Sequence, residues 1–283
     1  MTLTGAEADR AILQFQIRAR PIPPINELGT DLTTTTRRQL VVAGLRPLVA
    51  IGSYVWASSH GHWILAVLLV AVVFLTTVVV VHDLMHHALG LSRRANALFL
   101  SGFTMLMLDS GHALAATHAA HHRLFPSNDD PEAYLAGWPI GRVLCAGPTY
   151  RYRLWTWAWR EHPSQRRTFL AEATIQTAVL SAAAITTVAR HLPELGVYVL
   201  AATLGSWLFP LISVSQVHDP NGATALQQSK TMRGRLIPPL LLGMGYHLEH
   251  HLWPTVPAHH LAETARRAQQ LLEAQNATIS YIP

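Results

Sequence analysis

The sequence has few charged residues for its length. Only 13% of its 283 residues are Asp, Glu, Lys or Arg, about half the share of roughly 25% that soluble globular proteins carry. Half of the residues are hydrophobic, so we expect a protein embedded in lipid. Cysteine is nearly absent as well: Cys145 stands alone. An internal disulfide is therefore excluded, and thiols do not indicate the redox compartment.

Motifs for several other functions are missing. The net charge of +5 could suggest nucleic-acid binding, but the sequence has a single lysine and no basic tract, and it contains no nucleic-acid-binding motif. Residues 1–39 contain no long apolar run, so we expect no cleaved signal peptide and expect the later hydrophobic segments to be retained. The GxGxxG fingerprint of dinucleotide-binding domains is absent too.

Long hydrophobic runs are present. The clearest is WILAVLLVAVVFLTTVVVV, which contains no ionisable residue and is long enough to cross about 30 Å of hydrocarbon. Another run is interrupted by Arg46 and Pro47, and a later pair is joined by a turn that contains Pro193. We predict four membrane-spanning helices in two hairpins, at residues 40–57, 63–81, 168–189 and 195–217.

The distribution of basic residues predicts how these hairpins are oriented. Of the 21 lysines and arginines, 19 lie in residues 1–39, 82–167 and 218–283, and the two exceptions are Arg46 and Arg190. By the positive-inside rule, these three segments and both termini are predicted to be cytoplasmic. A soluble bundle with unusually apolar helices would not explain this asymmetry.

Histidines form three clusters with similar spacing, HDLMHH, HAAHH and HLEHH. Spacings of three and four residues place imidazoles on one helix face, where they can converge on a metal. One zinc ion is satisfied by about four ligands, so the eight clustered histidines indicate two metal ions. Iron, zinc, copper and nickel all suit imidazole. The eight residues are His82, His86, His118, His121, His122, His247, His250 and His251.

The predicted topology brings the clusters together at one membrane edge. His82 directly follows the second predicted span, and the other two clusters lie in the middle and last cytoplasmic segments. All three can therefore meet without crossing the bilayer. A metal transporter more often has its ligands near the bilayer midplane, which disfavours that function.

The three motifs, in this order around two hydrophobic hairpins, resemble the integral-membrane fatty acid desaturase and hydroxylase family, which includes carotenoid ring hydroxylases and ketolases. The resemblance covers about residues 81–257. It implies an all-α integral membrane protein in which a cytoplasmic helical cap holds a histidine-rich dimetal site. It also implies two iron ions that use O2 and electrons to attack a C–H bond of a lipid. Residues 1–39 would be a cytoplasmic N-terminal segment, and residues 40–283 the catalytic domain.

The resemblance adds a ninth metal ligand. Family members supply a further histidine from the end of the last span, and His218 in SQVHDP stands in that place. In some members an asparagine one turn earlier holds an iron-bound water, whereas this sequence has Val214. That iron would then be more open or have a different donor. Imidazole suits oxidative chemistry because a thiolate would itself be oxidised.

Residues around the clusters are expected to orient them. Ligating histidines need their second ring nitrogen held by a carboxylate or a carbonyl. We predict this role for four acidic residues, Asp83, Asp130, Asp219 and Glu249. Six other histidines are interpreted as neighbours, packing residues or surface residues: His60, His62, His87, His112, His259 and His260.

Two further features are interpreted as structural. The run RYRLWTWAWR at residues 151–160 alternates arginine with tryptophan, a pattern typical of the membrane interface. Glu172 and Gln176 share one face of the third predicted span. An ionisable residue at that depth is expected to face the interior of the helix bundle.

Histidine ligands do not distinguish desaturation from hydroxylation, because both begin with hydrogen abstraction. The segments GYHLEHHLWPTVP and HHRLFPSNDDPE resemble carotenoid hydroxylases and ketolases as much as acyl desaturases. Either lipid would enter from the bilayer.

Electrons would come from an external donor, and the basic cytoplasmic face suits an acidic carrier such as ferredoxin or cytochrome b5. Two functions of other classes remain as alternatives: a membrane metal-dependent hydrolase, and a non-catalytic metal-binding or transport protein. The absence of an HExxH motif disfavours the hydrolase.

Overall fold

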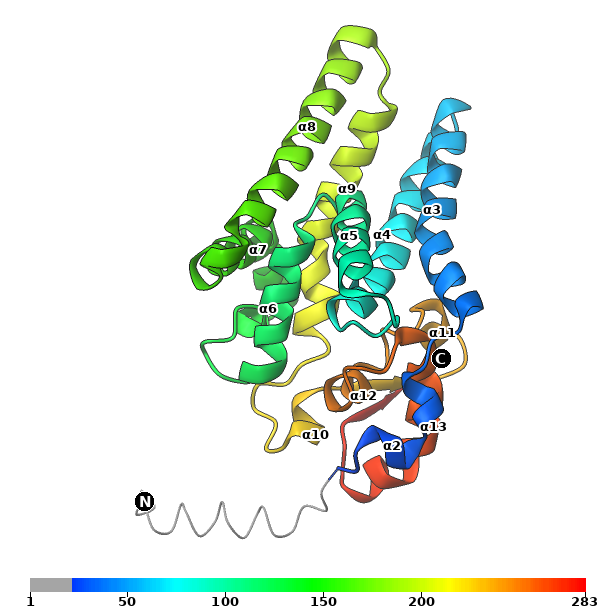
Figure 1. Cartoon of the computed structure of the whole chain (residues 1–283), viewed down its shortest axis with the longest axis vertical. Helices are drawn as coiled ribbons and strands as arrows, with labels where there is room; N and C mark the ends of the chain where they lie inside the picture. The colour runs from blue at the N-terminus through cyan, green and yellow to red at the C-terminus, as the bar shows by residue number, and fades with distance from the viewer. Residues whose placement is uncertain (1–21) are drawn as a thin grey trace.

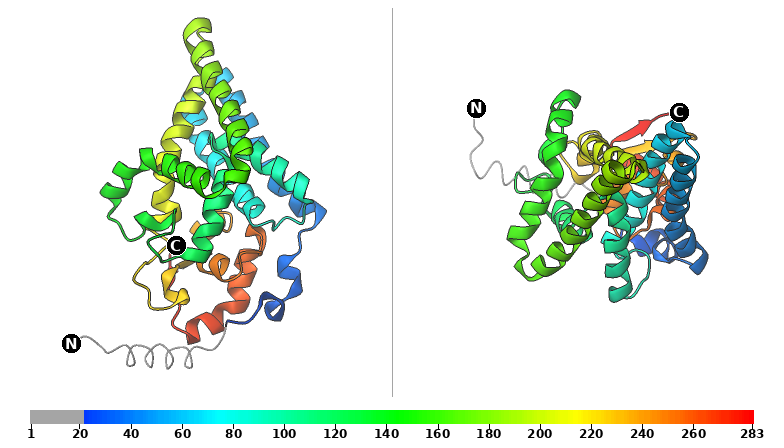
Figure 2. Two further views of the ribbon diagram at one scale, coloured as in Figure 1. Left: turned by 60° about the vertical axis from the view of Figure 1, so that its left-hand side comes forward. Right: turned by 90° about the horizontal axis from the view of Figure 1, so that it is seen from above.

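Long helices project from a smaller cap in the part of the chain that the computed structural model describes, residues 22–283 (Figure 1). The helical hairpins extend from one end of the molecule and the cap closes the other, as further views also show (Figure 2). The N-terminal segment predicted at residues 1–39 lies only partly within the described residues.

Four helices are long and apolar enough to cross a membrane, which confirms the predicted number of spans. The first hairpin is α3 (Arg37–Ser59) with α4 (Trp63–Met85), and the second is α8 (Arg166–Arg190) with α9 (Glu194–Pro210). Most of these bounds lie close to the predicted ones. Two ends differ: α4 continues for a further turn, so His82 lies inside the helix and not directly after it. The fourth span was predicted to reach residue 217, but α9 ends at Pro210 and a π-helical turn follows it.

The first hairpin shows why α3 tolerates the interruption seen in the sequence. A reciprocal capping box between Thr36 and Gln39 starts the helix, and the helix then runs through Arg46 and Pro47 without a break. Pro47 removes one backbone donor, while its ring is buried. The turn to α4 includes Gly61 at φ 75°, a conformation that glycine adopts without strain.

The outer faces of the hairpins are apolar. Ile64 is 83% exposed, and Leu68, Val188 and Leu200 are exposed as well. Such a continuous apolar surface would be unstable in water and fits contact with lipid tails. On the inner side, the rings of Tyr54 and Tyr198 meet edge to face with centroids 5.1 Å apart, which joins α3 to α9.

A bent helix pair lies between the two hairpins and was not predicted from the sequence. It consists of α5 (Arg93–Thr104), η2 (Met105–Met107) and α6 (Gly111–Leu124), and the two arms meet at 100°. Leu108 adopts φ 56° at the bend. This geometry is that of a broken span or a re-entrant loop. It matters for function because α6 contains the second histidine cluster.

One long helix, α7 (Ile140–Glu161), packs beside α6 and α9. It contains the arginine and tryptophan run. Arg153 lies over the ring of Tyr134 at 3.8 Å from the centroid, and Arg151 pairs with Asp109 at 2.7 Å. These contacts attach α7 to the loop before it and to the bend of the α5–α6 pair.

The cap consists of short elements around one longer helix. Its two strands pair in parallel, with Thr231 opposite Ile279 and Arg233 opposite Tyr281, and this small sheet is the only departure from the predicted all-α fold within residues 22–283. The cap elements are α2 (Ile25–Leu28), η1 (Thr30–Thr33), α10 (Ala225–Gln228), β1 (Thr231–Arg233), α11 (Ile237–Leu240), α12 (His247–Leu252), α13 (Ala258–Ala274) and β2 (Ile279–Tyr281).

The described part of the N-terminal segment packs onto this cap. The indole of Trp253 donates to the carbonyl of Pro23 at 3.0 Å. Arg267 of α13 pairs with Asp31 at 2.7 Å. Apolar side chains of α2 pack against buried residues of α12 and α13 such as Leu248 and Leu272. The cap is therefore built from both ends of the described chain.

Candidate metal centre

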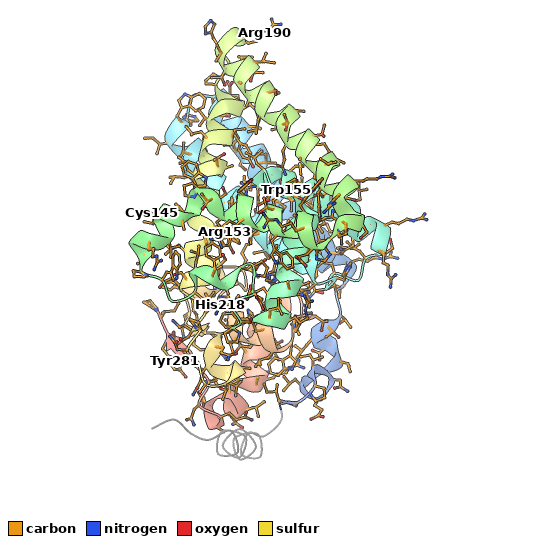
Figure 3. The ribbon with its side chains drawn as sticks, turned by 90° about the vertical axis from the view of Figure 1, so that its left-hand side faces the viewer. Cys145, Arg153, Trp155, Arg190, His218 and Tyr281 are labelled. Carbon is orange, nitrogen blue, oxygen red and sulfur yellow. The ribbon has the colours of Figure 1, made fainter. Side chains whose placement is uncertain are left out.

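Four separate parts of the chain bring the histidines together where the membrane helices meet the cap. His82 lies in the last turn of α4, the second cluster lies on α6, and the third lies on α12. His218 follows a π-helical turn, η5 (Leu211–Ser215), at the end of α9. In Figure 3 His218 lies near the cap, far from Arg190 at the opposite tip of α8.

The first group contains His82, His86, His118 and His250, whose potential ligand atoms all lie within 4.8 Å of one another. The Nε2 atoms of His82 and His250 are 3.1 Å apart. His122 adjoins this group, because its Nε2 lies 2.8 Å from Nε2 of His250 and 3.2 Å from that of His118. These residues come from all three clusters.

The second group contains His121, His218, His247 and His251, again within 4.8 Å of one another. Nε2 of His218 lies 2.9 Å from that of His247 and 3.0 Å from those of His121 and His251. The rings of His122 and His251 have centroids 4.4 Å apart, so His122 lies between the two groups. Eight of the nine predicted ligands thus form two adjacent groups, and the ninth, His122, lies between them.

The short distances between nitrogen atoms in the second group are better explained by a shared metal ion than by hydrogen bonds between the imidazoles. Each imidazole nitrogen offers either one proton or one lone pair, so Nε2 of His218 cannot satisfy three neighbouring nitrogens at once. Two donors about 2.1 Å from one metal, at right angles to each other, would be about 3.0 Å apart. In the first group, Nε2 of His86 is buried with no hydrogen-bond partner in the described structure. These nitrogens are suited to a metal.

Burial keeps most of these imidazoles neutral. Burial first, and then the neighbouring imidazoles, hold the pKa values of His247, His250 and His251 well below the ordinary value. The pKa of His218 is lowered to about 3 by burial and by His121. A neutral imidazole has a free lone pair, which is the form that binds metals.

Two carboxylates hold ring nitrogens that face away from the cluster. Nδ1 of His121 donates to Asp130 at 2.6 Å, and both side chains are buried. Nδ1 of His118 donates to Glu132 at 3.0 Å. Burial opposes ionisation of Glu132, but His118 and His121 outweigh it and lower its pKa to about 2. Each contact fixes the tautomer that leaves Nε2 free for a metal.

A backbone carbonyl holds the ninth histidine. Nδ1 of His218 donates to the carbonyl oxygen of Val214 at 3.1 Å. Val214 is buried against Leu135 and Tyr150, so an apolar side chain fills the place where the resemblance had suggested that an asparagine could stand. Single π-helical turns are rare and occur often at functional sites. Here the π turn η5 ends three residues before His218.

Comparison with known proteins agrees with this geometry. Residues 58–283 match the fatty acid desaturase family. This chain belongs to that family. It is also similar to the Delta(8)-fatty-acid desaturase of Euglena gracilis, with 35% identity over 72 residues. The matched segment covers 24% of this chain and 17% of that relative.

Of the four carboxylates predicted to orient histidines in this desaturase-family chain, Asp130 contacts an imidazole, and the others have different partners. Asp83 accepts from the backbone N–H of Ala258 at 2.8 Å. Asp219 accepts from the backbone of Asn221 in a turn. Glu249 is fully buried and pairs with Arg233 of β1. Asp83 and Glu249 do not contact the histidines next to them in sequence, because adjacent residues of a helix point about 100° apart.

Two acidic residues form contacts that the sequence analysis did not assign. Glu132 holds His118, although 14 positions separate them and only the loop after α6 brings them together. Glu172 is buried, as expected, and accepts from Nδ1 of His112 at 2.8 Å and from Ser110 at 2.5 Å. The sequence does indicate that Glu172 has polar partners, because an acidic residue within an apolar span needs them.

The remaining histidines lie outside both groups. His87 is exposed, and His112 is engaged with Glu172. His60 and His62 pack around Trp56 at the far end of the first hairpin. His259 and His260 begin α13, where their rings adjoin each other. His162 and His191 also lie outside both groups. That the two groups and the adjoining His122 act as metal ligands stays a prediction.

Proposed function

We propose that this protein is a membrane di-iron oxidoreductase that uses O2 to desaturate or hydroxylate a C–H bond of a lipid. The observation that carries the proposal is the convergence of nine histidines beside the ends of apolar helices, eight of them in two adjacent groups and His122 between the groups. Nitrogen donors alone fit several metals, and membership of the fatty acid desaturase family supports iron.

The roles of the chain's own residues follow from their contacts. Asp130, Glu132 and the carbonyl of Val214 fix the tautomers of three histidines. His122 lies between the groups and suits a ligand to either ion. When bound, the two iron ions would supply oxygen activation for hydrogen abstraction. The lone cysteine, Cys145, is exposed and outside both groups, so no thiol there competes for the oxidant.

The similarity to a fatty-acid desaturase favours desaturation of an acyl chain. In that reaction two C–H bonds are broken and a C=C bond forms, while O2 takes up the two hydrogen atoms of the substrate, two electrons from a donor and two protons, and leaves as two waters. Hydroxylation would instead insert one oxygen atom and release one water. A carotenoid ring hydroxylase or ketolase of the same superfamily is the second candidate. It is favoured by the resemblance of the segments HHRLFPSNDDPE and GYHLEHHLWPTVP to such enzymes.

An external electron donor and a cytoplasmic orientation complete the proposal. The donor would be a ferredoxin or cytochrome b5-type carrier, attracted by the basic segments outside the spans. We propose that these segments, the metal centre and both termini are cytoplasmic. Electrostatic attraction predicts that the reduction rate falls as ionic strength rises. A rate that does not depend on ionic strength would contradict this carrier type.

The deciding experiment joins metal analysis to lipid profiling. The chain is expressed in a host supplied with fatty acids or carotenoids, and we expect two irons per chain and a new lipid that forms only with O2. His250→Ala should abolish the product, while the matched variant His60→Ala, altered at an exposed position outside the site, should retain it. An added double bond supports the desaturase, and an oxygenated carotenoid supports the alternative. One zinc per chain with unchanged lipids would overturn both.

A further inference from the structure

A separate cavity lies between the first membrane hairpin and the cap. It has a volume of about 350 Å³ and is bordered by the start of α3, the last turns of α4 and the first residues of α13. None of the nine clustered histidines lines it. The residues that matter for its chemistry are Arg38, Gln39, Val42, Arg46, Asp83 and His259.

Two arginines in this cavity have no acidic partner. Arg38, Val42 and Arg46 follow one another at intervals of four residues, so they share one face of α3. Both arginines are exposed, and neither forms an ion pair with any residue of the described chain. Arg46 is nine residues into the helix, about 14 Å from its start. An arginine at that depth extends toward the phosphate layer.

The other polar groups of the cavity determine which ligand charge it would bind. Nε2 of His259 is buried and has no hydrogen-bond partner in the part of the chain that the structure describes. Asp83 is the one carboxylate that lines the cavity, and it is engaged with the N-terminus of α13 through Ala258. Two guanidinium groups against one carboxylate leave a net charge of about +1, which complements a monoanion.

The apolar surface indicates that the monoanion belongs to a lipid. Val42, Val79 and Val80 also line the cavity. Val41 and Leu45 continue this apolar surface along α3 and are 55% and 49% exposed. Two guanidinium groups on either side of apolar side chains match a phosphate headgroup with acyl chains. We propose that this cavity binds the headgroup of an anionic membrane phospholipid.

The bound phospholipid would be a structural ligand and not the substrate. The cavity is bordered by the face of α4 that presents Thr76, Val80 and Asp83, whereas His82 and His86 occupy another face. The headgroup would join α3 to the first turn of α13. It would therefore attach the cap, which supplies the third histidine cluster, to the membrane hairpin.

The test uses the full metal-loaded chain in detergent, titrated with dioctanoyl phosphatidylglycerol and followed by native mass spectrometry and thermal unfolding. We expect one tightly bound phosphatidylglycerol and a higher unfolding temperature. The double variant Arg38→Gln/Arg46→Gln should bind at least about tenfold more weakly, because it loses charge-assisted contacts, and should not be stabilised by the lipid. Without lipid, its unfolding temperature should equal that of the wild type.

Matched controls separate this site from general attraction to basic residues. Arg37→Gln/Arg93→Gln removes two exposed arginines that do not line the cavity, and it should bind phosphatidylglycerol like the wild type. Phosphatidylcholine and dioctanoylglycerol should bind several-fold more weakly than phosphatidylglycerol. Equal binding of all three lipids, or equal loss in both double variants, would overturn the proposal. Equal stabilisation by inorganic phosphate alone would overturn the assignment to a lipid.

Discussion

Nδ1 of His121 lies 2.6 Å from Oδ2 of Asp130, and both side chains are almost completely buried. Burial disfavours a proton on His121, but the hydrogen bond and charge of Asp130, together with Glu132, outweigh it and raise the pKa of His121. The carboxylate also accepts from the backbone N–H groups of Glu132 and Ala133. Asp130 thus fixes both the imidazole of His121 and the loop that contains Glu132.

Asp130→Asn should therefore weaken metal binding in the second group selectively. Loss of such a partner costs about 10- to 100-fold in metal affinity. The first group does not contain His121, so the iron content should fall from two toward one per chain, as measured by elemental analysis. Asp129→Asn, at the exposed neighbouring position, is the control and should retain both irons. A variant D130N that keeps two irons with wild-type affinity would contradict this role.

Glu172→Gln should destabilise the protein through the bent helix pair. Glu172 of α8 accepts from Ser101 of α5 at 2.5 Å and from Ser110 and His112 at the start of α6. Losing the charge should cost about 1–3 kcal/mol of unfolding free energy, because buried hydrogen bonds to a carboxylate are strong. Denaturant unfolding in mixed micelles measures the change. Glu161→Gln, altered at an exposed site, should have little effect.

Arg233→Ala should have the largest effect on stability among these substitutions. Arg233 pairs with the fully buried Glu249, whose other oxygen accepts from Thr231 at 2.6 Å. Removing one partner of a buried ion pair typically costs about 3–5 kcal/mol, since the other charge remains buried. Thermal unfolding should show this loss of stability. The control variant Arg235→Ala, altered at an exposed neighbouring position, should keep the unfolding temperature of the wild type.

A double variant distinguishes the buried charge from the packing of Arg233. Replacing both partners, Arg233→Met with Glu249→Met, removes the unpaired charge and should recover part of the stability lost in Arg233→Ala. If the double variant were less stable than the single variant, the cost would come from packing or from loss of the hydrogen bond that Thr231 donates to Glu249.

Removal of metal should lower the unfolding temperature reversibly. A metal that binds the folded chain stabilises it by about 2.7 kcal/mol when its free concentration is 100 times its dissociation constant. Chelation at near-neutral pH should therefore destabilise the wild type, and Fe(II) should restore the unfolding temperature. His60→Ala should respond equally. If chelation removed the metal without changing the unfolding temperature, the two groups would not hold it in the folded chain.

The sequence predicted the membrane helices well because they depend on local properties. A long apolar run such as the one from Trp63 needs no tertiary contact to be recognised. The spacing of the histidines is equally local: eight of the nine predicted ligands form the two groups, and His122 lies between them. The bend at Leu108 was not predicted, because its backbone is fixed by distant contacts from Arg151 and Tyr198.

The orienting carboxylates were harder to predict for a related reason. Proximity in sequence favoured Asp83 and Glu249, but helical geometry turns each away from the neighbouring ligand and toward another element. Glu132 contacts His118 only because the loop after α6 folds back. Tertiary structure therefore decides which acidic residues orient the imidazoles.

The π turn at Leu211–Ser215 makes the direction of His218 tolerant of one change in chain length. A π turn contains one more residue than the α-helix around it, so its residues rotate the chain about as far as one residue fewer would in an α-helix, where each contributes about 100°. Deletion of one residue within the turn should therefore restore regular α-helical winding and leave His218 directed into the second group. A second deletion has no extra residue to remove and should turn His218 out of that group by about 100°.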